Sequence, residues 1–83
     1  MPIWVTRSRR RITLFGQVRP AERGQIVRVQ FRRRHHHYRT LAHVRLRNRR
    51  GYFVRHFRRR HGYWRLLWKK PGGVKYRSRT VRT

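Results

Sequence analysis

The stretch Arg11-Ile12-Thr13-Leu14-Phe15-Gly16-Gln17-Val18 decides the fold class of this 83-residue chain. Ile, Leu, Gly and Val alternate in it with Arg, Thr, Phe and Gln, which is the period-two pattern of a half-buried β-strand. The same alternation predicts further strands at residues 2–6, 27–31, 38–46, 52–57, 63–68 and 74–81. Short turns rich in Gly, Pro and basic residues separate these segments. The sequence therefore predicts an all-β domain of six or seven antiparallel strands, a sandwich or a small barrel.

The core of this domain must be small. A chain of this length buries only roughly 60–65% of the surface that it exposes when unfolded. Eleven aromatic residues (3 Trp, 4 Tyr and 4 Phe) nevertheless argue against a disordered basic tail. Five of them occupy the alternating positions of the predicted strands, and we expect them in the core: Phe31, Phe53, Phe57, Trp64 and Trp68. No cysteine is present, so the chain has neither disulfides nor thiolate metal ligands.

Charge is the dominant feature of the composition. Twenty-six Lys and Arg residues stand against a single acidic residue, Glu22, and give a formal net charge of +25. Such charge destabilises a compact state through self-repulsion, and one carboxylate cannot relieve it. An external anion must therefore balance it: nucleic acid, teichoic acid or another acidic polymer, anionic lipid, or an acidic protein. Arginine supplies 23 of the cations, and its planar group suits bidentate phosphate contacts, although a GC-rich genome would also favour it.

Several motifs resemble those of bacterial Ig-like modules related to the carboxypeptidase-regulatory and prealbumin-like sandwiches. They lie at residues 12–20, 24–30, 38–42, 48–53 and 62–66. The resemblance covers roughly residues 11–82 and implies a seven-stranded antiparallel Greek-key sandwich. Such modules are spacer or adhesive units, without catalysis, of secreted or cell-surface proteins. This chain departs from the pattern in its charge and at Arg55, where the family places an inward apolar residue.

Two regions follow from this interpretation. Residues 1–10 form a basic N-terminal segment that carries an edge strand, or a strand exchanged with a neighbouring chain, and residues 11–83 form a single β-sandwich domain.

The strand pattern also predicts where the charge gathers. If consecutive strands run alternately up and down, every second connection lies at the same end. One end then collects the candidate polyanion site: Arg9, Arg10, Arg11, Arg32, Arg33, Arg34, Arg58, Arg59 and Arg60, with His35, His36, His37 and His61. The opposite end receives Arg19, Arg23, Arg47, Arg49, Arg50, Lys69 and Lys70, and also Glu22. The alternative is that every face is positive and that binding is diffuse.

Four aromatic residues between arginines are candidates for stacking on unpaired bases: Trp4, Tyr52, Tyr63 and Tyr76. Packing against arginine through cation–π contacts is the competing interpretation. The tract His35-His36-His37 does not predict a metal site, because adjacent side chains on an extended segment point to opposite faces and no carboxylate or thiolate completes the set. We expect these imidazoles to add positive charge below pH ~6.5, and we expect no cofactor.

Catalysis lacks the residues that it needs. The chain has no pair of carboxylates, no cysteine, no Ser-His-acid set and no glycine-rich phosphate loop. The sequence therefore predicts a non-enzymatic structural or adhesive module that binds polyanions with little sequence specificity. One alternative is a self-assembling filament subunit, a homo-oligomer through residues 2–6 that could coat nucleic acid. Others are a ribosomal or nucleoid-type protein, which would be cytoplasmic with its nucleic acid, and a membrane-disrupting cationic sheet.

Overall fold

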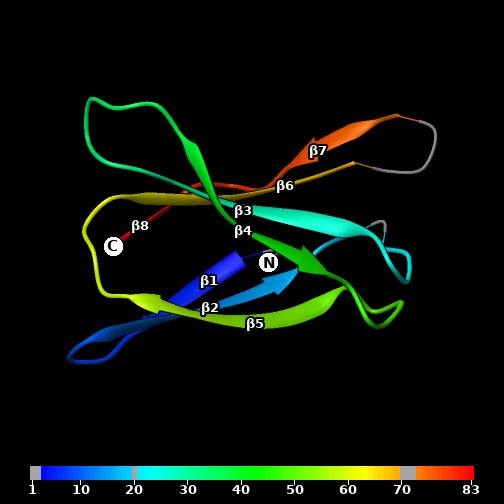
Figure 1. Ribbon diagram of the computed structural model, residues 1–83, viewed down its shortest axis with the longest axis horizontal. Helices are drawn as coiled ribbons and strands as arrows, with labels where there is room; N and C mark the ends of the chain where they lie inside the picture. The colour runs from blue at the N-terminus through cyan, green and yellow to red at the C-terminus, as the bar shows by residue number, and fades with distance from the viewer. Residues whose placement is uncertain (1–2, 20, 70–72) are drawn as a thin grey trace.

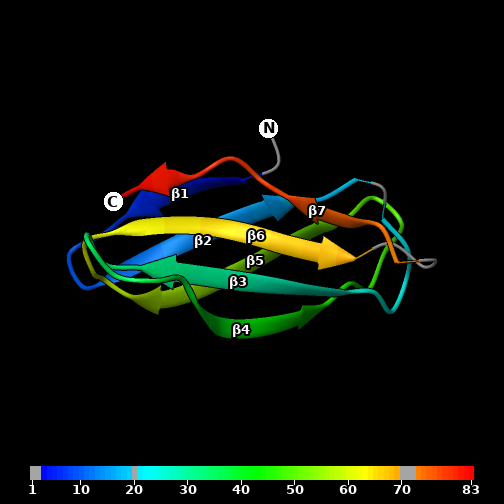
Figure 2. The ribbon, with the colours of Figure 1, turned by 90° about the horizontal axis from the view of Figure 1, so that it is seen from above.

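Two antiparallel sheets face each other in the computed structural model of the chain, which describes residues 3–19, 21–69 and 73–83 (Figures 1 and 2). The first sheet has the order β1-β2-β5, with β1 at Ile3–Arg7, β2 at Arg11–Gln17 and β5 at Tyr52–Arg58. The second has the order β4-β3-β6-β7, with β8 also paired to β6. Its strands are β3 (Ile26–Arg32), β4 (Arg39–Arg45), β6 (Tyr63–Lys69), β7 (Lys75–Arg77) and β8 (Val81–Arg82). The predicted all-β, antiparallel fold is confirmed for the described residues.

The core lies between the sheets and is built by the alternation seen in the sequence. In β2, Ile12 and Leu14 are fully buried, and the residues between them face outward. Strands β3 and β6 contribute the facing layer through Val27, Val29, Phe31, Trp64, Leu66 and Trp68. Burying one such side chain stabilises the fold by about 1.5–3 kcal/mol. Phe53 and Phe57 are half-buried and pack against this cluster, so all five predicted core aromatics lie in the core or against it.

The last predicted strand, 74–81, is in fact two strands, and this part of the prediction was wrong. Ser78 lies between β7 and β8 and is buried. Its backbone N–H donates to the carbonyl of Leu66 at 3.0 Å, while its hydroxyl oxygen accepts from the N–H of Leu66 at 2.7 Å. The side chain thus takes the place of a backbone carbonyl in the ladder. The described residues consequently form eight strands, two of them short, where we expected six or seven.

The N-terminal strand pairs within its own chain. Strand β1 is antiparallel to β2 over all five of its residues, from Ile3 opposite Gly16 to Arg7 opposite Ile12. Ile3 is fully buried, and its carbonyl accepts a hydrogen bond from Arg79 Nη2 at 3.1 Å. The described part of the segment 1–10 therefore packs as an edge strand of the sandwich. Pro2, where the predicted strand began, lies outside the described residues.

Arg55 lies between Phe53 and Phe57 in β5, at a position where the period-two alternation predicts an inward apolar side chain. It is the register partner of the buried Leu14, so its Cβ starts on the inner face of β5. The residue is nevertheless exposed, because β5 is at the edge of its sheet and the long side chain reaches solvent there. An inward charge on an edge strand opposes sheet-to-sheet aggregation.

No helix that is long and apolar enough to span a membrane occurs in the part of the chain that the structure describes.

Candidate polyanion-binding surface

Three connections meet at one end of the sandwich, which we call the arginine-rich end (Figure 1, left). They are the β1–β2 hairpin (residues 8–10), the β3–β4 loop (33–38) and the β5–β6 loop (59–62). This is the end at which alternating strand directions were expected to bring the three connections together. The fold thus places Arg9, Arg10, Arg33, Arg34, Arg59 and Arg60 around one end, and Arg11 and Arg58 lie directly opposite each other where β2 begins and β5 ends.

Hydrogen bonds join two of these connections, the β1–β2 hairpin and the β5–β6 loop. The N–H of Arg59 donates to the carbonyl of Arg10 at 3.0 Å, and Arg59 Nη1 donates to the carbonyl of Ser8 at 3.4 Å. The chain end joins them, because Thr83 donates its N–H to Gly62 at 2.8 Å and its hydroxyl to Arg60 at 2.8 Å. The β1–β2 hairpin, the β5–β6 loop and the chain end thus form one connected surface.

Arg60 lies at the centre of this positive field. Its guanidinium carbon lies 5.4 Å from the centroid of the Phe31 ring. Partial burial lowers the pKa of Arg60, and the charges of Arg39, Arg33 and Arg58 lower it further. Each of these causes disfavours the charged form of Arg60. An anion that bound among these arginines would offset the repulsion between their charges.

Arg39 belongs to this cluster and was missed by the sequence reasoning. Simple alternation from Ala42, Val44 and Leu46 places Arg39 on the outer face. A register shift between Val29 and Gln30 reverses the sides, so Arg39 becomes the partner of the buried Phe31. A bulge of this kind inserts one residue and re-aims the side chains beyond it. The sequence reasoning also missed Arg82. This residue lies beside the same end, since β8 pairs with the start of β6 and Arg82 is opposite Tyr63.

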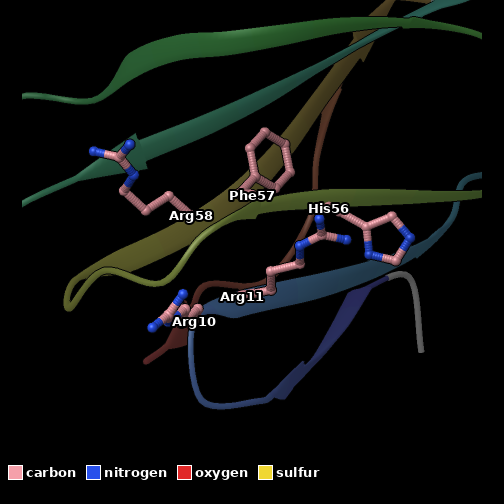
Figure 3. A pocket seen from close by; sticks show the side chains of 5 residues that line it. All are labelled: Arg10, Arg11, His56, Phe57 and Arg58. Atoms are coloured by element: carbon pink, nitrogen blue, oxygen red, sulfur yellow. The ribbon is translucent and has the colours of Figure 1, made fainter.

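A basic hollow of about 410 Å³ opens where β2 begins and β5 ends (Figure 3). Arg10, Arg11 and Arg58 line it together with His56 and Phe57. A second hollow of about 420 Å³ lies beside the β3–β4 loop, lined by Phe31, Arg32, Arg33, His36, His37 and Arg39. Both are large enough for a phosphate group with its hydration.

Arg32 differs from the other candidate cations. It ends β3 and lies 4.2 Å from the ring centroid of Tyr63 and 5.3 Å from that of Tyr38. Arg65 lies 3.8 Å from the Tyr38 centroid and donates from Nε to Gln30 Oε1 at 2.9 Å. Arg32 therefore packs in an aromatic and polar network on the outer face of the second sheet.

The histidine tract forms the turn of the β3–β4 loop. The N–H of His36 donates to the carbonyl of Arg33 at 3.0 Å, and His35 has a φ of 65°, which is unusual for a residue other than glycine. His35, His36, His37 and His61 are all exposed beside the arginines. Within residues 3–19, 21–69 and 73–83, no three His, Cys, Asp or Glu side chains form a group that would hold a metal ion.

The opposite end holds a second set of exposed cations together with the acidic residue. Arg19, Arg23, Arg47, Arg49, Arg50 and Lys69 are exposed there, as is Glu22, whose N–H donates to Gln25 Oε1 at 3.0 Å. Lys70 lies outside the described residues. The only acidic residue of the sequence is thus at the end away from the arginine-rich end.

The four candidate stacking residues divide between the two sheets. Tyr63 lies under Arg32, and Tyr76 stacks on Trp68 with centroids 5.7 Å apart, so both pack within the second sheet. Trp4 and Tyr52 lie on the first sheet and are 38% and 50% exposed. Trp4 stacks on Phe15, with centroids 5.6 Å apart and 8° between the ring planes. Phe15 was not among the candidates, although its place between buried Leu14 and Gly16 puts it on the outer face.

Comparison of the chain with protein-family models, with curated proteins and with solved structures finds no match.

Proposed function

We propose that this protein is a non-enzymatic structural or adhesive module that binds polyanions electrostatically, with little sequence specificity. The proposed ligand is nucleic acid or an anionic cell-surface polymer. The observation that carries the proposal is the meeting of three arginine-bearing connections at one end, with Glu22 at the other end. The Arg59–Arg10 hydrogen bond joins two of these connections.

The physical argument is one of uncompensated charge. A net charge of +25 in 83 residues destabilises the compact state. At the arginine-rich end this repulsion is local, since Arg33, Arg39 and Arg58 act together on Arg60. Phosphates relieve it, and guanidinium groups hold them through paired, charge-assisted hydrogen bonds. Binding of this kind contacts backbone phosphates and carries little sequence information.

We propose in addition that the sandwich is an Ig-like Greek key. The order β1-β2-β5 against β4-β3-β6-β7 supports this, because the connections β2–β3 and β4–β5 cross between sheets and β5 returns beside β2. The resemblance to Ig-like modules would place the protein on a cell surface or outside the cell. A ribosomal or nucleoid-type role, with a cytoplasmic location, is the alternative for the same surface.

The test compares two matched variants. In the first, Arg9, Arg10, Arg33, Arg34 and Arg58 are replaced by Gln, and in the second Arg19, Arg23, Arg47, Arg49 and Arg50 are. All ten are exposed, and each variant loses the same charge. Fluorescence anisotropy is measured with single-stranded DNA, duplex DNA, RNA and a teichoic acid, each over a salt series.

We expect the wild type to bind these polymers with an affinity that falls steeply with salt. The first variant should lose clearly more affinity than the second. Equal losses would mean diffuse binding by all faces, and no binding at low salt would overturn the proposal. A strong preference for RNA or duplex DNA at high salt would favour the ribosomal or nucleoid-type role.

A further inference from the structure

The outer face of the β1-β2-β5 sheet carries a row of aromatic and apolar side chains, which we call the aromatic row. Directly opposed residues of an antiparallel sheet lie on the same face, and Trp4, Phe15 and Val54 are such partners across the three strands. Val54 is 51% exposed, and Trp4 and Phe15 are in parallel contact. Tyr52, the partner of Gln17, continues the face away from the arginine-rich end.

The rings of this row leave stacking surface free. One face of the Trp4 indole lies against Phe15, and the residue as a whole remains 38% exposed. Strand β1 is the edge of its sheet, so among residues 3–19, 21–69 and 73–83 no further strand of this sheet pairs beside Trp4. A planar group that stacked on Trp4 would extend the existing Trp4–Phe15 stack.

Cations and hydrogen-bonding groups flank the aromatic row on the same face. The next row toward the arginine-rich end holds Thr6, Thr13 and His56, with Thr13 Oγ1 and His56 Nδ1 3.0 Å apart. Beyond it, Arg11 and Arg58 are partners and line the basic hollow (Figure 3). Phe15 lies four positions after Arg11 along β2, which is roughly 13 Å at the usual rise of a strand.

This order of groups selects among polyanions. A polyanion without bases makes no use of a stacked ring pair, and in a duplex the base faces are occupied by their neighbours. An anionic membrane surface would favour a continuous apolar band, but the polar Thr6–Thr13–His56 row interrupts the face. A basic track with aromatic rings is the arrangement with which proteins hold single strands, through phosphate contacts and base stacking.

We infer that the outer face of the β1-β2-β5 sheet binds single-stranded nucleic acid, with an unpaired base stacked on Trp4 and phosphates held in the basic hollow by Arg10, Arg11 and Arg58. The inference rests on the proposed function, because it assumes that the protein binds polyanions. It adds that the bases themselves are contacted, on a sheet face that continues from the β1–β2 hairpin of the arginine-rich end.

The test uses a 12-nucleotide deoxyadenosine strand, an abasic strand of the same length and charge, and the corresponding duplex. Tryptophan fluorescence is the first readout. Trp64 and Trp68 are buried in the core, so quenching on binding reports Trp4. We expect quenching by the single strand, little quenching by the abasic strand or the duplex, and loss of the quenching in Trp4→Phe.

Affinity is the second readout, with variants chosen to keep the fold. Trp4→Leu should weaken binding of the deoxyadenosine strand by about fivefold or more, since one stacked base contributes about 1–3 kcal/mol. It should leave the abasic strand unchanged, and Trp4→Phe should restore part of the affinity. Tyr63→Leu is the control, because that ring already lies under Arg32. Circular dichroism establishes that each variant is folded.

The outcomes separate this inference from the proposed function. Equal affinity for the abasic and base-bearing strands, unchanged in Trp4→Leu, would overturn the stacking site and leave polyanion binding in place. Absence of binding to all three polymers would remove both. A blue shift of the Trp4 emission with vesicles of anionic lipid, and tighter binding to them than to the single strand at equal total charge, would overturn the inference in favour of a membrane surface.

Discussion

The hydroxyl oxygen of Ser78 accepts a hydrogen bond from the backbone N–H of Leu66 across the second sheet, and the two atoms are 2.7 Å apart. The bond keeps the chain attached to β6 between β7 and β8. Replacing Ser78 by Ala leaves the buried N–H of Leu66 without its acceptor. An unsatisfied buried donor costs about 1–3 kcal/mol.

We therefore expect Ser78→Ala to lower the free energy of unfolding by about 1–3 kcal/mol, measured by urea denaturation. Ser8→Ala is the control, because the Ser8 hydroxyl donates to Arg11 at 3.3 Å in an exposed turn. The control should change stability by less than about 0.5 kcal/mol. If both variants had the same stability, the bridging role of Ser78 would be refuted.

Gly51 and Gly24 provide a second pair with matched backbone and different surroundings. Their φ angles are 75° and 87°, and L-residues adopt such values at a cost of about 1–2 kcal/mol. A Cβ at Gly51 would collide with the backbone carbonyl oxygen of Val18, whereas one at Gly24 would meet no atom within 4 Å. Gly24→Ala should therefore show the conformational cost alone, and Gly51→Ala that cost plus the displacement of Val18.

Thermal unfolding of the two variants measures this difference. We expect a moderate decrease in Tm for Gly24→Ala and a clearly larger one for Gly51→Ala. The collision argument fails if the two decreases are the same.

Arg60 should destabilise the free protein through its charge. Its pKa is lowered in the folded state, first by burial and then by Arg39, Arg33 and Arg58. A lowered pKa on a cation means that the unfolded state binds the proton more tightly, so the charge opposes folding at every pH below the folded pKa. Arg60→Met keeps apolar contact with Phe31 and removes the charge.

At low salt we expect Arg60→Met to raise the Tm and Arg9→Met, in the exposed hairpin, to raise it less. Added salt should shrink the difference, because it screens repulsion among partly exposed charges. A lower Tm for Arg60→Met at low salt would show that the cation–π contact with Phe31 outweighs the repulsion.

The fold was predictable where a local pattern determines it. The alternation of residues 11–18 places Ile12 and Leu14 inside and Thr13 outside, and the structure does the same. The up-and-down order of the strands brings the basic connections to one end without knowledge of the sheets. The break at Ser78 was not predictable, because it depends on one hydroxyl meeting the N–H of Leu66 across the sheet.

The candidate site shows the same limit. The exposed loop arginines are at the predicted end because loop positions follow from strand order. Arg39 joins the arginines around Arg60 only because the register shifts between Val29 and Gln30. No turn residue in the sequence marks the position of this shift. The sequence left base stacking and packing open for Tyr63, Tyr76 and Trp4 alike, and only the three-dimensional structure shows the two tyrosine rings packed against Arg32 and Trp68.

The alternative in which the N-terminal strand is exchanged between chains can be tested with a disulfide, because the sequence contains no cysteine. Thr6 and Thr13 are directly opposed in the β1–β2 pair, and opposed residues have Cα atoms about 4.5–5.5 Å apart, within the range that a disulfide bridges. In Thr6→Cys/Thr13→Cys, pairing within one chain gives an intramolecular bond. Exchange with a neighbour gives covalent dimers and longer chains, because residue 6 of each copy then faces residue 13 of the next.

We expect mild oxidation to consume both thiols while the protein still migrates as a monomer on a non-reducing gel. The reason is that Ile3 is fully buried and Val5 packs against the core of the same chain. Thr13→Cys alone is the control for random coupling, and a protein concentration series separates the two reactions. Covalent oligomers from the double variant alone would instead establish strand exchange, and the filament would then become the leading function for this module.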